Sequence, residues 1–195
     1  MNTRLSLTLI TVFLLNGCVA YTAVAPGPVT VGAMTVETGR MWNAAPGGTS
    51  AASNPDTQIW TSDGLLLNRI VIIPGVQDGQ PIFKQESDSQ ALPLFKADML
   101  PNEIEELTES SIVKLFGEGQ VSVDTANLRP NRFGEDRGVL FDMLVTVSDG
   151  PNYRGLTGAF IHEQQLFLVI YLGAEPHYYN KHRAEAEAII LSARI

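Results

Sequence analysis

The residues able to bind metals or transfer protons are few and scattered along the sequence. A zinc-protease helix needs two histidines four residues apart, but the residue four after His162 is Leu166, and the surrounding segment is typical of a turn. His177 and His182 are five residues apart, outside the spacing of three or four that puts two ligands on one helix face. We therefore expect no metal site, and we expect these histidines to lie on the surface or at the start of a helix.

Motifs of covalent and phosphate chemistry do not occur. The sequence contains no G-x-S-x-G nucleophile motif and no Walker-type loop. Gly117 and Gly119 follow an expected helix, whereas the glycines of a dinucleotide-binding turn follow a strand. The sequence thus indicates no catalytic residue and no cofactor, and it favours a non-enzymatic protein.

Carboxylates leave one enzymatic alternative, a periplasmic hydrolase with a dispersed acidic site. Asp63 and Asp78 each precede a glycine, and a turn explains both. Asp142 lies between apolar residues on an expected strand, so it either joins a site or faces solvent. The alternative requires several carboxylates to meet in space, and the candidates are Asp63, Asp78, Glu86, Asp88 and Asp142.

Arginines and aromatic residues could form binding surfaces. Four arginines surround one expected strand connection, but Glu135 and Asp136 lie among them, so a salt-bridged, solvated loop is favoured over an anion or partner patch. Six aromatic residues are available for an interface, although core packing explains most of them. These residues are Arg129, Arg132, Arg137 and Arg154, and Trp42, Trp60, Tyr153, Tyr171, Tyr178 and Tyr179.

Composition limits the class of protein. The chain has 195 residues, of which 45% are hydrophobic, enough for one sizeable core. Its net charge is −8 and 17% of its residues are charged, which argues against a nucleic-acid-binding surface and against a disordered acidic tail. Because Cys18 is the single cysteine, no internal disulfide can form.

This cysteine lies directly after an apolar run at the N-terminus. Arg4 supplies a positive charge, and Leu5 to Leu15 form an apolar stretch of eleven residues. As a helix the stretch would be about 16 Å long, roughly half the thickness of the hydrocarbon core of a bilayer. It is therefore typical of a signal peptide and too short to span a membrane.

The residues Leu15-Asn16-Gly17-Cys18 resemble the lipobox of bacterial lipoproteins. This resemblance implies a signal peptide over residues 1–17, cleavage between Gly17 and Cys18, and lipidation of Cys18 on its sulfur and its freed amine, palmitate being a typical acyl group. Val19 after the cysteine implies, by the same resemblance, the outer membrane with the domain facing the periplasm. The alternative is a free or buried cysteine behind an ordinary secretory signal.

Residues 18–35 are predicted to be a flexible tether, since residues 19–35 are uncharged and rich in alanine, valine, proline and glycine. Residues 36–195 are predicted to form one globular domain. Residues 33–43, partly before it, could form a short strand that joins the domain edge, and the breaker-rich residues 43–56 predict an exposed loop.

Hydropathy patterns predict the other elements. Strands are expected at 58–61 and 65–73, the second stopped at Pro74-Gly75. Ile104, Leu107 and Ile112 fall on one side of a helix from Pro101 to Phe116, which Gly117 ends. Later strands are expected at 121–128, 139–148, 153–161 and 165–172, the last three in an antiparallel meander, followed by a helix at about 178–193.

This element order predicts an α+β fold, an antiparallel β-sheet with helices packed on it. Together with the ending LFLVIYLGAEPHYYNKHRAEAEAIILSARI, it is similar to PsbP-like α/β-sandwich domains. The resemblance implies a fold that hosts mostly binding and assembly factors, and it transfers no active site.

The leading hypothesis is therefore a lipid-anchored envelope protein with a non-enzymatic binding or assembly role. Its expected partners are the membrane, through the lipid anchor, and a protein of the envelope, with no nucleic acid. The alternatives are the hydrolase described above and a carrier of a small apolar ligand, which needs an enclosed apolar cavity.

Overall fold

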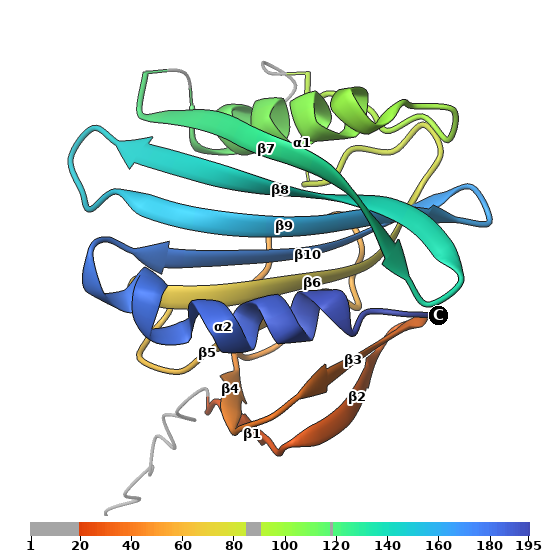
Figure 1. Cartoon of the computed structure of the whole chain (residues 1–195). Coiled ribbons are helices and arrows are strands. Elements are labelled where there is room, and N and C mark those ends of the chain that lie inside the picture. The colour runs from red at the N-terminus through yellow and green to blue at the C-terminus, as the bar shows by residue number, and fades with distance from the viewer. Residues whose placement is uncertain (1–19, 85–90, 118) are drawn as a thin grey trace, which may run out of the picture.

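An antiparallel sheet of eight strands with a helix on each face forms the domain (Figure 1). The computed structural model describes residues 20–84, 91–117 and 119–195, so the expected signal peptide, the Gly17–Cys18 cleavage site and Cys18 lie outside the described residues. The strands are β1 (Thr22–Val24), β2 (Gly27–Val31), β3 (Met34–Thr38), β4 (Trp42–Ala44), β5 (Gln58–Thr61), β6 (Asn68–Gln77), β7 (Val121–Phe133), β8 (Asp136–Val147), β9 (Tyr153–His162) and β10 (Gln165–Ala174), and the helices are α1 (Pro101–Phe116) and α2 (His177–Leu191).

The strand order in the sheet is β1-β4-β5-β6-β10-β9-β8-β7. Strands β8, β9 and β10 pair antiparallel in succession, which confirms the predicted meander, and β7 adds a fourth strand to it. The middle of β10 is apolar without alternation because both of its faces are buried: Leu168 and Ile170 face the layer of α1, whereas Phe167 and Val169 face the layer of α2. The predicted α+β fold is confirmed.

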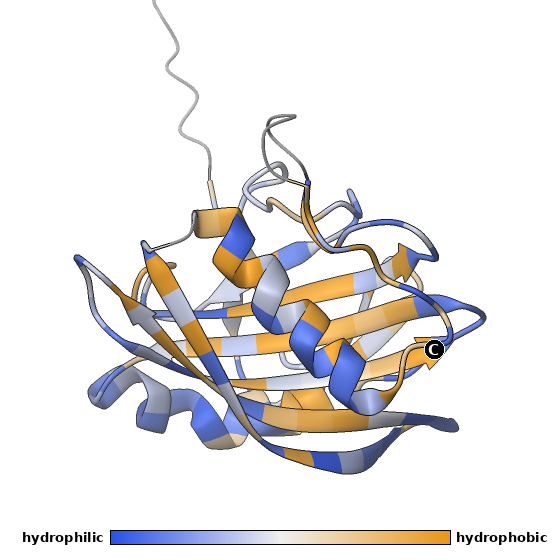
Figure 2. Cartoon of the chain, turned by 90° about the horizontal axis from the view of Figure 1, so that it is seen from above, coloured by the Kyte–Doolittle hydropathy of each residue, from blue (hydrophilic) through white to orange (hydrophobic). Residues whose placement is uncertain are grey.

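Helix α1 covers one face of the sheet, as Figure 2 shows from above. Its bounds are those predicted, with Pro101 in the first turn and Gly117 at its end. The carboxylate of Glu103 accepts a hydrogen bond of 2.6 Å from the backbone N–H of Leu100 and so satisfies a donor at the helix start. Among the described residues, no helix is long and apolar enough to cross a bilayer.

Helix α2 covers the opposite face, together with the hairpin of β2 and β3. Its Ile189 and Ile190 are fully buried, as the predicted helix required. Gly158 on β9 allows this close packing, because a Cβ atom there would lie 2.5 Å from Cγ2 of Ile190 and 3.0 Å from the ring of Phe133.

The predicted tether over residues 18–35 is wrong from Thr22 onward. This segment contains β1, which pairs with β4, and the hairpin of β2 and β3. Val31 and Met34 are buried in the α2 layer, where they alternate with exposed or half-buried neighbours. The proline and glycine content hid this alternation, and the folded domain begins before residue 36.

Two further boundaries differ from prediction. The expected loop at residues 43–56 contributes to β4, and its buried Ala52 forms a bridge with Phe83. Strand β6 continues through Pro74 to Gln77, because the register against β10 shifts at this point and the missing N–H of proline is accommodated there.

Replacing Gly158 with alanine tests the contact between α2 and the sheet. Gly158→Ala should lower the free energy of unfolding by about 1–3 kcal/mol, since the added methyl group overlaps Ile190 and Phe133. Gly47→Ala is the matched control, because nothing lies within 4 Å of a Cβ atom at Gly47. Urea unfolding of both variants measures the difference, and equal stabilities would contradict this account of the packing.

Candidate functional site

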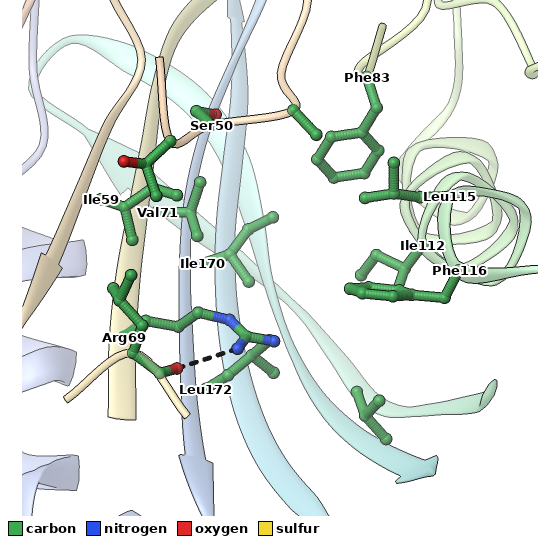
Figure 3. Close-up of a pocket in the computed structure, with 14 residues that line it drawn as sticks. Ser50, Ile59, Arg69, Val71, Phe83, Ile112, Leu115, Phe116, Ile170 and Leu172 are labelled. Atoms are coloured by element: carbon green, nitrogen blue, oxygen red, sulfur yellow. Dashed lines mark hydrogen bonds between the residues drawn. The ribbon is translucent and has the colours of Figure 1, made fainter. Parts of the chain in front are cut away.

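A cavity of about 420 Å³ lies between the C-terminal turns of α1 and the sheet (Figure 3). Its floor is the α1-facing side of the sheet, where Val71 of β6 and Ile170 and Leu172 of β10 lie side by side. One wall is formed by Ile112 and Phe116 of α1. A volume of this size is within the range of small-molecule sites in proteins, about 300–1,000 Å³.

The opposite wall comes from residues 49–51 between β4 and β5, with Ile59 of β5. The expected exposed loop thus forms part of the cavity. Ile170 is 2% exposed on the floor, whereas Phe116 is 51% exposed at the rim. The cavity is therefore open to solvent at one side and deeply apolar within.

Among the described residues that line the cavity, Arg69 is the one with a charge. Its side chain leaves β6 and places the guanidinium between Ile170 and Leu172 (Figure 3). Nη1 donates a hydrogen bond of 3.1 Å to the backbone oxygen of Leu65, and the guanidinium carbon lies 5.4 Å from the ring centroid of Tyr153. These contacts hold the cation at the inner edge of the cavity.

The environment of Arg69 disfavours its charge. Burial lowers the pKa of the guanidinium, and the neighbouring Tyr153 only partly opposes this effect. No carboxylate of residues 20–84, 91–117 or 119–195 forms an ion pair with it. Because arginine remains protonated in proteins, the cavity contains a cation that an anionic group could neutralise.

A second candidate is a polar network under α2, on the other side of the sheet. His182 is 1% exposed, which corrects the expectation of a surface histidine. Its Nε2 is hydrogen-bonded to Asp63 and its Nδ1 to Arg40. Lys181 donates a further bond of 2.6 Å to Asp63. The network joins α2 to the segments that follow β3 and β5.

The partners of His182 define its protonation. Arginine can only donate, so Nδ1 accepts from Arg40 and the hydrogen on Nε2 is donated to Asp63. Burial lowers the pKa of His182, although its hydrogen bond to Asp63 acts in the opposite direction. Burial by itself raises the pKa of Asp63, but the hydrogen bonds from Lys181 and His182 outweigh it and the net pKa is lowered.

The histidine of this network has no ring nitrogen free to act in catalysis or metal binding. Both ring nitrogens of His182 are engaged, so the imidazole offers no lone pair to a metal or a substrate. Thr38 and the backbone N–H of Gly39 donate to Glu185 of α2 beside it. The arrangement is a structural connection between α2 and two loops.

The three candidate carboxylates that the structure describes do not converge. Asp63 belongs to the network under α2, whereas Asp78 accepts a hydrogen bond of 2.9 Å from the backbone of Ala97. Asp142 pairs with Arg129 at 3.4 Å and accepts from Asn127 at 2.8 Å. The other two candidates, Glu86 and Asp88, lie outside the described residues.

The remaining candidates have structural partners. Arg129 and Arg154 form ion pairs with Asp142 and Glu175, as the favoured salt-bridged interpretation predicts, whereas Arg132 donates to the backbone oxygen of Glu135. Five of the six aromatic residues are buried; Tyr178 is partly buried. Within the part of the chain that the structure describes, no group of three histidine, cysteine, aspartate or glutamate residues could hold a metal ion.

The fold belongs to a known architecture, the PsbP-like α+β sandwich. The chain is similar to the solution structure of cyanobacterial PsbP (CyanoP) from Synechocystis sp. PCC 6803, with a TM-score of 0.59 over 92% of this chain and 95% of that chain. Identity is 10%, so the likeness shows the fold and transfers no site residue. No protein-family model and no curated protein matches the sequence.

Arg69, the residue that gives the cavity its charge, was not among the residues predicted from the sequence to form a site. A signal was present, because Arg69 interrupts the apolar run LLLNRIVII. Asp142 interrupts an apolar strand in the same way, and it pairs at the surface with Arg129. The sequence pattern, a charge within an apolar strand, is therefore the same for both residues. Only the structure shows that Arg69 lines the cavity and that Asp142 does not share its surroundings.

The state of His182 predicts how stability depends on pH. Its pKa is lower in the folded chain than its ordinary value of about 6.5, so its contribution is complete above that pH and is lost as the pH falls below it. The free energy of unfolding should therefore decrease between about pH 8 and about pH 5, by at most about 1.4 kcal/mol per pH unit from this group. Asp63 adds a loss only at lower pH, below about 3.8.

His182→Gln should remove this part of the pH dependence, whatever its effect on stability at neutral pH. The matched control is His177→Gln, because His177 is exposed at the start of α2. Urea unfolding across the same pH range gives the slope for each protein. A slope that His182→Gln leaves unchanged would contradict the neutral, doubly bonded imidazole.

Proposed function

We propose that this chain is a non-enzymatic binding protein of the bacterial envelope, anchored through a lipid on Cys18, whose domain binds an apolar group in the cavity beside α1. The observation that carries the proposal is the cavity itself. It is an open hollow of about 420 Å³ whose lining is almost entirely apolar, and a mostly apolar hollow with a few polar groups is the usual form of a small-molecule site. Exposed apolar surface of this kind marks binding sites.

The polar groups support binding over catalysis. His182 has both ring nitrogens engaged, and Asp142 and Asp63 are held by cationic partners. A catalytic acid or base must reach its substrate within hydrogen-bond distance. In these three residues, hydrogen bonds to other protein groups already occupy that position. The PsbP-like fold, which hosts mostly binding and assembly factors, agrees with an accessory role.

The lipid anchor and the location rest on the sequence. The lipobox ending at Cys18 and the apolar run before it support lipidation and export. Val19 favours the outer membrane, and an envelope protein or a small apolar ligand is the expected partner. One acyl chain holds a protein only weakly on a membrane, whereas two or more hold it stably.

Filling the cavity should abolish binding of apolar probes. Ala51→Phe places a ring into the cavity and should lower labelling by a photoactivatable decanol roughly tenfold, since an apolar ligand loses most of its buried contact area. The matched control, Ala23→Phe, adds the same ring at an exposed position of β1. Full-length protein in its membranes is labelled, and mass spectrometry of its peptides locates the probe.

In the original chain, the labelled peptides should contain residues 49–51 and the last turns of α1. Thermal unfolding of each variant confirms that the fold is retained. Labelling that is spread over other surfaces, or that Ala51→Phe does not reduce in a folded protein, would refute the cavity as the binding site.

The anchor has its own test. Intact mass of protein extracted from native membranes should exceed the mass of a chain that starts at Cys18 by a diacylglycerol and one acyl group. Cys18→Ser should remove this surplus while leaving the fold of residues 22–195 intact. An unmodified chain that starts at another residue would exclude the lipoprotein assignment and leave the cavity unaffected.

A further inference from the structure

We propose that the ligand of the cavity is a single-chain amphipathic carboxylate, with its apolar tail on the floor of the cavity and its carboxylate on Arg69. This assignment rests on the proposed function, because it names the class of ligand for the same cavity. Three features of the cavity support it: the availability of the guanidinium, the absence of a counter-ion among residues 20–84, 91–117 and 119–195, and the match between one cation and one apolar volume.

The guanidinium is available to a ligand. Arginine carries five N–H donors, and the structure gives one bond from Arg69, that from Nη1 to the backbone oxygen of Leu65. Among the described residues, the buried nitrogens that lack a hydrogen-bond partner do not include those of Arg69. Its other nitrogens are therefore not sealed from solvent without a partner, and because Arg69 lines the cavity, a carboxylate there could accept two parallel hydrogen bonds.

The charge of Arg69 is uncompensated among the described residues. The half-buried Arg129 and the exposed Arg154 each form an ion pair with a carboxylate, whereas Arg69, which is also half-buried, forms none with a described residue. Transferring a charge into apolar surroundings is unfavourable unless the charge is paired. A ligand that brings a negative charge would remove this unfavourable situation, and a neutral ligand would leave it in place.

The shape of the cavity favours one chain with one charge. Val71, Ile170 and Leu172 form a floor that suits an alkyl tail, and Phe116 at the rim remains partly exposed for its end. A single cation matches the single negative charge of a carboxylate, and a volume of about 420 Å³ suits one alkyl chain better than the two chains of a phospholipid. These features select a fatty-acid-like carboxylate over a phospholipid.

A purely structural role for Arg69 is the competing explanation. The residue could serve only to hold the loop before β6 through Leu65 and to pack on Tyr153. That role predicts a loss of stability when Arg69 is replaced, but no preference of the cavity for anions. The two explanations therefore separate when binding of a carboxylate is compared with binding of the alcohol of the same chain length.

The test uses full-length protein in native membranes and two photoactivatable probes, decanoate and decanol, at about pH 8, where an ordinary carboxyl group is ionised. Decanoate should half-saturate labelling of the cavity at a concentration roughly tenfold or more below that of decanol, which is the fold-change expected from a charge-assisted hydrogen bond. Unlabelled decanoate should compete with both probes.

Arg69→Met should abolish this preference. Labelling by decanoate should weaken roughly tenfold or more, and labelling by decanol should weaken much less, because its neutral oxygen loses only an uncharged hydrogen-bond acceptor contact. Arg69→Lys, which retains the charge but not the planar fork, should keep part of the preference. Arg137→Met is the matched control, because Arg137 is an exposed arginine outside the cavity. Partition of a probe into lipid is the same for every variant and cancels when variants are compared, and the two probes are compared with each other at their measured free concentrations.

The outcomes distinguish this inference from the proposed function. If decanol and decanoate label the cavity equally, or if Arg69→Met affects both probes equally, the carboxylate assignment is overturned and apolar binding stands. If neither probe labels the cavity of a folded protein, both proposals are overturned. Should Arg69→Met fail to fold, the comparison of the two probes on the original chain and on Arg69→Lys still decides the question.

Discussion

The structure depends on the burial of strand β10 from both sides. Its residues Leu166–Ala174 are buried throughout, with alternate side chains in two separate cores. A sheet whose central strand is apolar on both faces is stable only if each face is covered, because uncovered apolar surface favours association. Helix α1 supplies one cover and α2, with the β2–β3 hairpin, the other. The incomplete cover beside the end of α1 leaves the cavity.

Elements determined by local signals could be predicted from the sequence. Helix α1 has the predicted bounds, because Pro101, Gly117 and the spacing of its apolar residues all act within one segment. The hairpin of β2 and β3 could not be predicted in the same way. Its burial comes from contact with α2, and the backbone of Thr35 pairs with that of Arg194 at the other end of the chain. Contacts between residues so far apart in the chain cannot be predicted from the local sequence.

The same limit applies to the candidate site. His182 lies 119 residues from Asp63 and 142 residues from Arg40, so its burial and its neutral state follow only from the tertiary arrangement. Arg69 did carry a local signal, a charge within an apolar strand, but Asp142 carried the same one. What separates them is the opposite charge that the fold brings to Asp142 and, within the described residues, does not bring to Arg69.

The early start of β1 limits how far the domain could stand from a membrane. If Cys18 carries the lipid, four residue steps separate it from Thr22, a reach of about 14 Å when fully extended. The short β1–β4 edge of the sheet would then lie within one or two protein side chains of the lipid headgroups. A domain held at that height samples only the layer next to its own membrane, so any partner or ligand would have to come from that membrane or pass close to it.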